Sequence, residues 1–299
     1  MSTPQLDESI LRVIDERALA LEEQLNANVL FYVGRIHPAY LKPFRTFLED
    51  IAANKTKKKD SVAILLETGG GSVQTVEKMV ELIRAHYTGT VTFIVPDMAM
   101  SAGTVLCMSG NRIMMDYSSS LGPIDPQVLV KKNGEEMYVP ALGYLDKVAE
   151  LIGKSADNTL TAAEFALLKD LDLGLLRSYE QARDLSVELL KKWLIEYKFK
   201  DWIVHETTPE LLGQPVTDEQ RHARADEIAR MLGDNRLWHS HGRFIGINTL
   251  RDILRLRIDD YTHDDKLRPA IRTYTDLLTD YMSRQGMKFV LHSPHVKLF

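Results

Sequence analysis

The sequence has a single cysteine, Cys107, among its 299 residues. One cysteine excludes a disulfide within the chain, and this fits a reducing compartment. Basic residues are not in surplus either, since 37 Lys and Arg stand against 42 Asp and Glu, for a formal net charge of -5. A nucleic-acid-binding protein usually carries a basic surplus. We therefore expect no nucleic-acid partner.

Long apolar runs are also missing. The longest, such as residues 61–66 and 91–95, have the length of a strand. They fall short of the roughly 18 residues that a transmembrane helix needs. The N-terminal segment MSTPQLDESILRVIDERALALEEQL is acidic and lacks the basic stretch and apolar core of a secretory signal. These absences predict a cytoplasmic protein without a transmembrane anchor.

What the sequence does contain is an ordinary globular composition, 44% hydrophobic and 26% charged, which is enough for a sizeable core. Residues 6–25 place apolar side chains at helical spacing and predict an amphipathic N-terminal helix. From residue 61 onward, strands and helices alternate, which predicts an α/β fold with a mostly parallel sheet. In this region we expect strands at 61–67, 91–96 and 112–116, and helices at 73–86 and 101–109.

The second half of the chain begins with a predicted hairpin, QVLVKKNGEEMYVP, at residues 127–140. Its Asn-Gly pair favours a two-residue turn, because both residues tolerate positive φ. Beyond it the apolar spacing is mainly helical. We expect helices at 143–153, 161–169, 177–198, 218–232 and 267–284, and a last strand or extended arm at 287–292.

Two turns between these elements carry residues with chemistry. The first is ETGGGS at 67–72, where glycines permit a tight turn that exposes backbone amides. No GK[ST] follows, and the glycine spacing does not match a dinucleotide fingerprint, so both kinds of phosphate loop are excluded. Two interpretations remain open: an oxyanion hole built from amides, or a plain turn in which Ser72 caps the next helix.

The second turn is MAMSAGT at 98–104, which places Ser101 at a helix N-terminus among small residues. Nearby amides can stabilise negative charge there, although an N-cap serine would show the same pattern. Both turns follow parallel strands, so they lie at the same edge of the sheet, where ligands bind in open α/β folds. We therefore expect Ser101 and the glycine turn to form one site.

These segments resemble the Clp protease proteolytic subunit and signal peptide peptidase A. The phrase GPIDPQ at 122–127 makes the serine dehydrogenase proteinase family the nearest resemblance. The resemblance is strong over residues 61–127 and weaker to about residue 261. It implies an α/β, Clp/crotonase-like fold of repeated ββα-type units with added helices at both termini. The implied domains are an N-terminal amphipathic helix at 1–27, a peptidase domain at 28–261, and a C-terminal helix and arm at 262–299.

The same resemblance implies a serine endopeptidase that needs no cofactor and acts on peptide or protein substrates. By position, Ser101 is the nucleophile. The amides of Gly70 and Ala102 form the oxyanion hole, and Gly71 shapes it. Proteins of this fold generally form homo-oligomers, for which the N-terminal helix and the C-terminal arm are candidate contact elements.

The base that activates the serine is less directly indicated. The segment after the third strand, SSSLGPID, lacks the histidine that the Clp subunit uses. The signal peptide peptidase relatives use a lysine instead, and an amine with a lowered pKa can act as a general base. Lys147, beside an apolar helix face, is the preferred candidate, followed by Lys154. Asp125 either orients a base, binds substrate or stabilises a turn.

Two histidines and the single cysteine also have chemistry to be weighed. The turn WHSHGR at 238–243 contains His239 and His241 but no further ligands nearby, so we expect packing, a site wall or a subunit contact rather than a metal site. Cys107 is expected in the packing of the helix after Ser101. Two alternatives to a peptidase remain: a crotonase-like acyl-coenzyme A enzyme, which would not need Ser101, and a catalytically inactive oligomeric scaffold.

Overall fold

The computed structural model describes residues 4–54, 56–124, 127–132, 135–169, 171–205 and 209–296. Its central sheet has six strands in the order β10-β1-β2-β3-β5-β9. All neighbours in this sheet pair in parallel except β10, which is antiparallel to β1. The prediction of a mostly parallel sheet is confirmed. The strands are β1 (Asn28–Val33), β2 (Val62–Glu67), β3 (Val91–Val95), β5 (Arg112–Met115), β9 (Asp259–Asp260) and β10 (Val290–His292).

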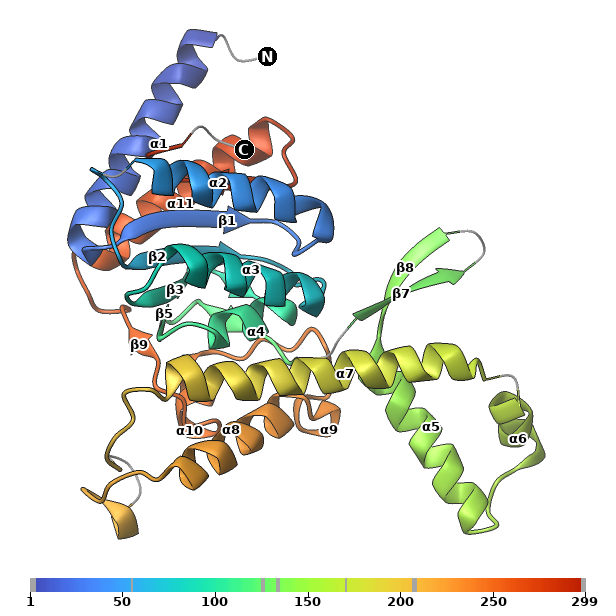
Figure 1. Cartoon of the computed structure of the whole chain (residues 1–299). Helices are drawn as coiled ribbons and strands as arrows, with labels where there is room; N and C mark the ends of the chain where they lie inside the picture. The colour runs from blue at the N-terminus through green and yellow to red at the C-terminus, as the bar shows by residue number, and fades with distance from the viewer. Residues whose placement is uncertain are drawn as a thin grey trace.

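Helices cover both faces of this sheet (Figure 1). Alternate strand residues point to opposite faces, so that Leu30 and Tyr32 of β1 join one core cluster and Phe31 joins the other. Strands buried on both faces have nearly continuous apolar sequences, as VLFYV and VAILL do. One face packs mainly against α2 (Leu41–Ala53), α3 (Val73–His86) and α4 (Ala102–Met108), and the other against α1 (Pro4–Leu25) and α11 (Leu267–Arg284).

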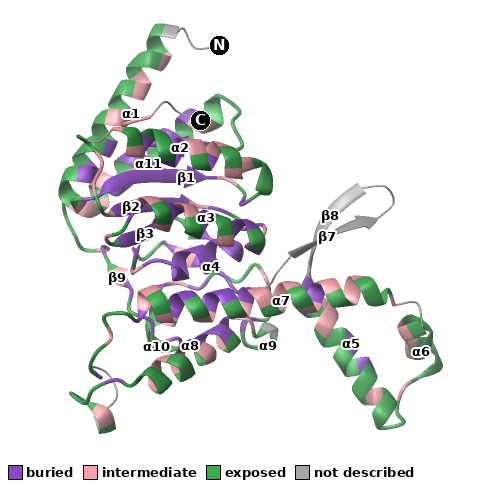
Figure 2. Cartoon of the chain, viewed as in Figure 1, coloured by how far each residue is buried: buried purple, intermediate pink, exposed green. Residues whose placement is uncertain are grey.

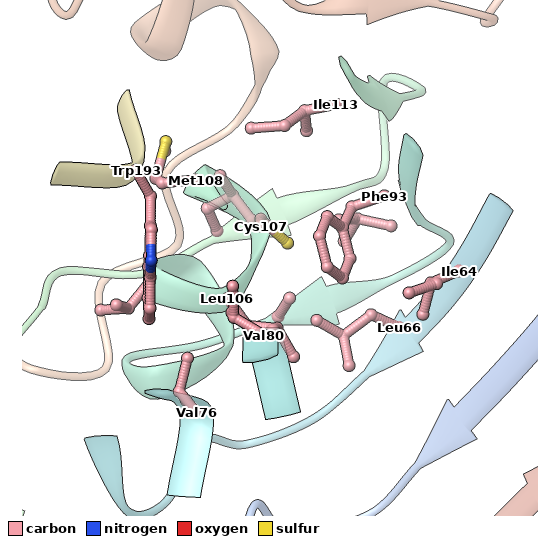
Figure 3. Packing of buried hydrophobic residues seen from close by; sticks show 14 of the residues in the cluster. Ile64, Leu66, Val76, Val80, Phe93, Leu106, Cys107, Met108, Ile113 and Trp193 are labelled. Carbon is pink, nitrogen blue, oxygen red and sulfur yellow. The ribbon is translucent and has the colours of Figure 1, made fainter. Parts of the chain in front are cut away.

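The larger core cluster lies around α4, the helix that follows Ser101. Figure 3 shows Cys107 among apolar side chains that include Phe93 and Trp193. The thiol is fully buried, and burial raises its pKa, so the predicted packing role of Cys107 is confirmed. This core is completed by α7 (Leu173–Trp193), its π-helical continuation Leu194–Lys198, α8 (Asp218–Leu232) and α10 (Ile247–Asp252).

Two further sheets have two strands each and are not part of the central sheet. In the first, β4 (Met98–Ala99) pairs in parallel with β6 (Ser120–Leu121). The second is the predicted hairpin of β7 (Gln127–Lys132) and β8 (Glu135–Pro140); its Asn-Gly turn lies outside the described residues. The remaining short elements are η1 (Pro38–Tyr40), η3 (Pro209–Leu211) and α9 (Asn235–Trp238).

A helical arm leaves the body of the protein. It consists of α5 (Ala141–Ala156), α6 (Ala162–Lys169) and the first turns of α7 (Figure 1). Helix α6 has the apolar sequence AAEFALLK and no buried residue, as Figure 2 shows by its colours. An apolar helix without buried residues normally packs against another surface.

The terminal elements belong to the same core as the sheet. Ile14 and Leu21 of α1 are fully buried in a cluster that also contains Ile271 and Leu278 of α11. The two helices therefore pack within the protomer. The domain boundaries at 28 and 261 stay predictions. No helix within the described residues is long and apolar enough to span a membrane, and the cytoplasmic location also stays a prediction.

Candidate active site

The sheet brings the two predicted turns together. β2 and β3 are parallel neighbours, so Glu67 and Val95 end their strands at the same edge. After β3 the chain turns back past the end of β2. There Thr68 accepts a hydrogen bond from the Met100 amide at 2.9 Å and donates its own amide to the Met98 carbonyl at 3.0 Å. These two bonds fix the segment that carries Ser101 against the start of the glycine turn.

Ser101 has a backbone conformation that L-residues rarely adopt, with φ 51° and ψ -112°. It occupies the N-cap position of α4, but its side chain makes no capping hydrogen bond to the described amides of that helix. Its residue surface is only 4% exposed. Strained, buried residues of this kind cluster at functional sites, and a strained serine between a strand and a helix is typical of a nucleophile. The simple N-cap interpretation of Ser101 is therefore disfavoured.

The glycine turn lies directly against the serine. A Cβ atom on Gly70 would stand 3.0 Å from Ser101 Cβ and 2.8 Å from the Met100 carbonyl. On Gly71 it would stand 1.9 Å from the Ile36 carbonyl oxygen. Both glycines have positive φ, 100° and 152°, so both positions require glycine for conformation and for space.

The amides around Ser101 divide into occupied and unoccupied donors. The Gly70 amide donates to the Thr68 hydroxyl oxygen at 3.0 Å. Within the described part of the chain, the amides of Gly71 and Ala102 donate to no protein group. Ala102 is fully buried, and buried amides are nearly always paired. Two unoccupied donors beside a serine are what an oxyanion needs.

The segment after β6 forms a further wall beside Ser101. The Gly122 amide donates to Thr104 Oγ1 at 2.9 Å, and the same hydroxyl lies 2.9 Å from the Ala99 carbonyl. A Cβ on Gly122 would stand 2.7 Å from the end of the Met100 side chain. Gly122 therefore holds this wall close to the residues that precede Ser101.

The WHSHGR turn approaches the same wall. Leu121 and Ile245 form an antiparallel bridge with two hydrogen bonds, of 3.0 and 2.8 Å. Trp238 is buried and donates its indole N–H to the Met231 carbonyl at 2.6 Å. Among the described residues there is no group of three or more His, Cys, Asp or Glu side chains that could hold a metal. The turn thus contributes packing beside the wall.

The two candidate lysines lie on the helical arm, away from α4 (Figure 1). Lys147 is 56% exposed, and its Nζ lies 3.0 Å from both carboxylate oxygens of Glu150. Lys154 Nζ lies 2.7 Å from Glu164 and 3.2 Å from Glu150. Hydrogen bonds to Glu164 and Glu150 raise the pKa of Lys154, whereas a general base needs a lowered one.

The structure therefore brings Ser101, Gly70, Gly71 and Ala102 together but not the lysines. Asp125, the remaining predicted site residue, lies outside the described residues. The sequence analysis does not predict one contact of the site, the hydrogen bond from the Gly70 amide to the Thr68 hydroxyl oxygen. A serine or threonine two residues before an amide in a turn often makes this bond, so the sequence did contain a signal for it.

The chain is similar to known proteins over about half of its length. The family model described as a ClpP-like SDH-type serine proteinase matches residues 48–201, just over half of the chain. The uncharacterized protein MJ0137 of Methanocaldococcus jannaschii is 29% identical over 157 residues, which are 50% of this chain and 53% of that protein. Uncharacterized protein MJ1495 of the same organism is 27% identical over 150 residues, 50% of this chain and 45% of that protein. The chain thus spans about half the length of the curated relatives it matches.

Two solved structures are similar to this chain over part of its length, with TM-scores below 0.5. A variant of the 1510-N membrane-bound stomatin-specific protease shares 23% identity over 48% of this chain and 70% of that chain, with a TM-score of 0.31. ClpP1 from Listeria monocytogenes shares 12% identity over 86% of this chain and 98% of that chain, with a TM-score of 0.43. The family match confirms the predicted Clp/crotonase-like fold. From the matched region and the serine turn within it, this chain belongs to the ClpP-like SDH-type serine proteinases.

Proposed function

We propose that the protein is a serine endopeptidase that hydrolyses peptide bonds through an acyl-enzyme on Ser101. The observation that carries the proposal is the strained, buried Ser101 beside two unoccupied amides. Ser101 Oγ attacks the scissile carbonyl carbon, and its proton passes to a base. Collapse of the tetrahedral intermediate releases the amine, which takes up a proton. Water then hydrolyses the acyl ester and restores the serine. These steps need no cofactor.

The oxyanion would be held by the amides of Gly71 and Ala102. The family resemblance implies the Gly70 amide as a donor, but this amide already donates a hydrogen bond to the Thr68 hydroxyl oxygen. Gly70 instead supports the close approach of the turn to Ser101, because any side chain there would collide with the Met100 carbonyl. Gly71 and Ala102 come from the two turns that meet at Ser101, one from each turn. Each donor of this kind typically contributes about 3–4 kcal/mol of transition-state stabilisation.

A Ser-Lys dyad with Lys147 completes the proposed machinery. In the described conformation Lys147 is bound to Glu150 and carried on the arm. For it to accept the serine proton, the ion pair with Glu150 must open and the arm must bring the amine to about 3 Å from Ser101 Oγ. Exposed ion pairs contribute only about 0–1 kcal/mol, so opening this pair costs little. We propose that substrate binding or assembly of subunits moves the arm in this way.

Lys147→Ala is expected to lower kcat by a factor of about 100 or more, since general-base catalysis contributes this much. Lys154→Ala is the matched control: Lys154 lies on the same helix and contacts the same Glu150, and this variant should keep its activity. The measurement is hydrolysis of a fluorogenic peptide across pH. Equal rates for Lys147→Ala and the wild type would remove Lys147 from the mechanism.

The protein is further proposed to act as a homo-oligomer in which α6 packs against a second copy of the chain. Phe165 and Leu167 are 61% and 62% exposed on a helix without buried residues. The charges beside them are paired within the arm, as Lys154 is with Glu164. A self-complementary contact between two near-neutral apolar faces fits these features better than an anionic partner does.

The double substitution Phe165→Glu and Leu167→Glu should therefore lower the molar mass measured by light scattering during gel filtration. Repulsion between the introduced carboxylates and loss of apolar contact both oppose association. Leu212→Glu is the control, because Leu212 is 65% exposed elsewhere on the surface, and its mass should equal that of the wild type. An unchanged mass in the double variant would rule out α6 as the contact.

A further inference from the structure

Arg272 of helix α11 contacts the segment that leads from β3 to Ser101. Its Nη1 donates to Asp97 Oδ1 at 2.8 Å, and its Nη2 donates to the Pro96 carbonyl at 2.7 Å. Pro96 and Asp97 are the two residues between β3 and β4. One side chain thus forms hydrogen bonds with both the backbone and a side chain of this short link.

The same guanidinium also holds the link between β5 and β6. Arg272 Nη2 lies 2.9 Å from Asp116 Oδ1, and Asp116 is fully buried at the end of β5. The Asp116 amide donates to Ser119 Oγ at 2.9 Å, and Ser119 Oγ donates to the Val95 carbonyl at 2.6 Å. Arg272 therefore connects the entries to β4 and β6, the two strands of the small sheet beside the site.

Asp116 keeps its negative charge at neutral pH. Burial acts to raise the pKa of Asp116, but hydrogen bonds from Ser118 and Arg272 outweigh it, so the net change is a lowered pKa. The Arg272 side chain is only 18% exposed. A planar guanidinium can bond to several oxygens in fixed directions, whereas a lysine ammonium cannot reproduce that fork.

The constraint reaches Ser101 through the backbone. The Asp97 carbonyl accepts from the Ser120 amide at 2.8 Å, which joins β4 to β6. Four residues beyond Asp97 lies Ser101, at φ 51°. A strained residue persists only where its surroundings over-determine its conformation. Hydrogen bonds to Thr68 fix one side of this segment, and Arg272 fixes its beginning.

We propose that Arg272 is a positioning residue for Ser101, which it holds in register with the Gly70–Gly71 turn by clamping the links that enter β4 and β6. The inference rests on the proposed function, in which Ser101 must face the oxyanion donors. In this proposal Arg272 acts on Ser101 indirectly, through Asp97 and the Pro96 carbonyl.

The test compares Arg272→Lys, Arg272→Gln and the control Arg284→Gln. Arg284 lies on the same helix, is largely exposed and pairs with Asp280. A displacement of about 1 Å can cost on the order of a hundredfold in rate. We expect Arg272→Lys to lose about tenfold in kcat per folded molecule with KM nearly unchanged. Arg272→Gln should lose more, and Arg284→Gln should match the wild type.

Two further measurements separate positioning from folding. Thermal unfolding gives the folded fraction of each variant, and hydrogen exchange reports on the Met100 amide, which is bonded to the Thr68 carbonyl. Faster exchange at Met100 in folded Arg272→Lys supports the proposal. Wild-type kcat in that variant overturns it, as does a loss that merely follows the folded fraction.

A failure of the proposed peptidase function gives results that differ from a failure of the Arg272 proposal. If the wild type hydrolyses no peptide and a fluorophosphonate does not label Ser101, the proposed function fails. The positioning role of Arg272 is then tested by hydrogen exchange alone. Unchanged protection of the Met100 amide in Arg272→Lys overturns this role, and lost protection supports it.

Discussion

Ser101→Ala is expected to abolish peptide hydrolysis, with a loss of at least a thousandfold. The substitution removes the only atom proposed to form the acyl-enzyme, and removal of a nucleophile is among the most damaging changes that a hydrolase can undergo. The fold should survive, because Ser101 makes no capping bond to the described amides of α4. The measurements are hydrolysis of a fluorogenic peptide and thermal unfolding.

Ser72 provides a matched control for this experiment. It stands at the start of α3, and its Oγ accepts a hydrogen bond from the Thr75 amide at 3.2 Å. It is therefore a true helix cap, unlike Ser101. Ser72→Ala should cost about 1 kcal/mol of stability and leave most of the activity. Full activity in Ser101→Ala, or equal losses in the two variants, would contradict the assignment of the nucleophile.

Gly71→Ala is expected to cause the second-largest effect, through both stability and activity. A Cβ there would lie 1.9 Å from the Ile36 carbonyl oxygen, in a backbone with φ 152°. The turn must shift, and with it the proposed oxyanion donor. We expect a loss of about 2 kcal/mol or more in stability. The rate should fall by about a hundredfold or more, the cost of one oxyanion donor.

Gly69 lies in the same turn and provides a matched control for Gly71→Ala. A Cβ at Gly69 would meet no atom within 4 Å, so Gly69→Ala should keep both activity and stability. Thermal unfolding and peptide hydrolysis of the two alanine variants give the answer. Similar behaviour of the two variants would show that the turn does not act through the geometry described for Gly71.

The sequence predicted the elements of the central sheet closely, and the reason is physical. Strands buried on both faces have short apolar runs, and the amphipathic helices between them have helical spacing. The helix predicted at 73–86 matches α3 residue for residue, and the strand predicted at 61–67 matches β2 to within one residue. The two-residue strands β4 and β6 were not predicted, because tertiary pairing rather than local pattern creates them.

Part of the candidate active site could likewise be predicted from the sequence. The carboxyl ends of parallel strands meet at one edge, so the proximity of Ser101 to the glycine turn followed from order along the chain. The hydrogen bond from the Gly70 amide to the Thr68 hydroxyl was not predicted, because it depends on the rotamer of Thr68 within the turn. The placement of Lys147 depends on where the arm stands. The contribution of Arg272 comes from a helix more than 150 residues away along the chain, as its bond to Asp116 shows, and no local pattern encodes it.

The most direct test of the central claim is reaction of the wild type with a fluorophosphonate, followed by mass spectrometry of its peptides. The account predicts one adduct, on Ser101, lost in Ser101→Ala, and no binding of an acyl-coenzyme A in a parallel measurement. A crotonase-like enzyme would bind the acyl-coenzyme A, and an inactive scaffold would not be labelled at any pH. An adduct on another residue, or no adduct together with bound acyl-coenzyme A, would contradict the assignment of Ser101 as the nucleophile of a peptidase.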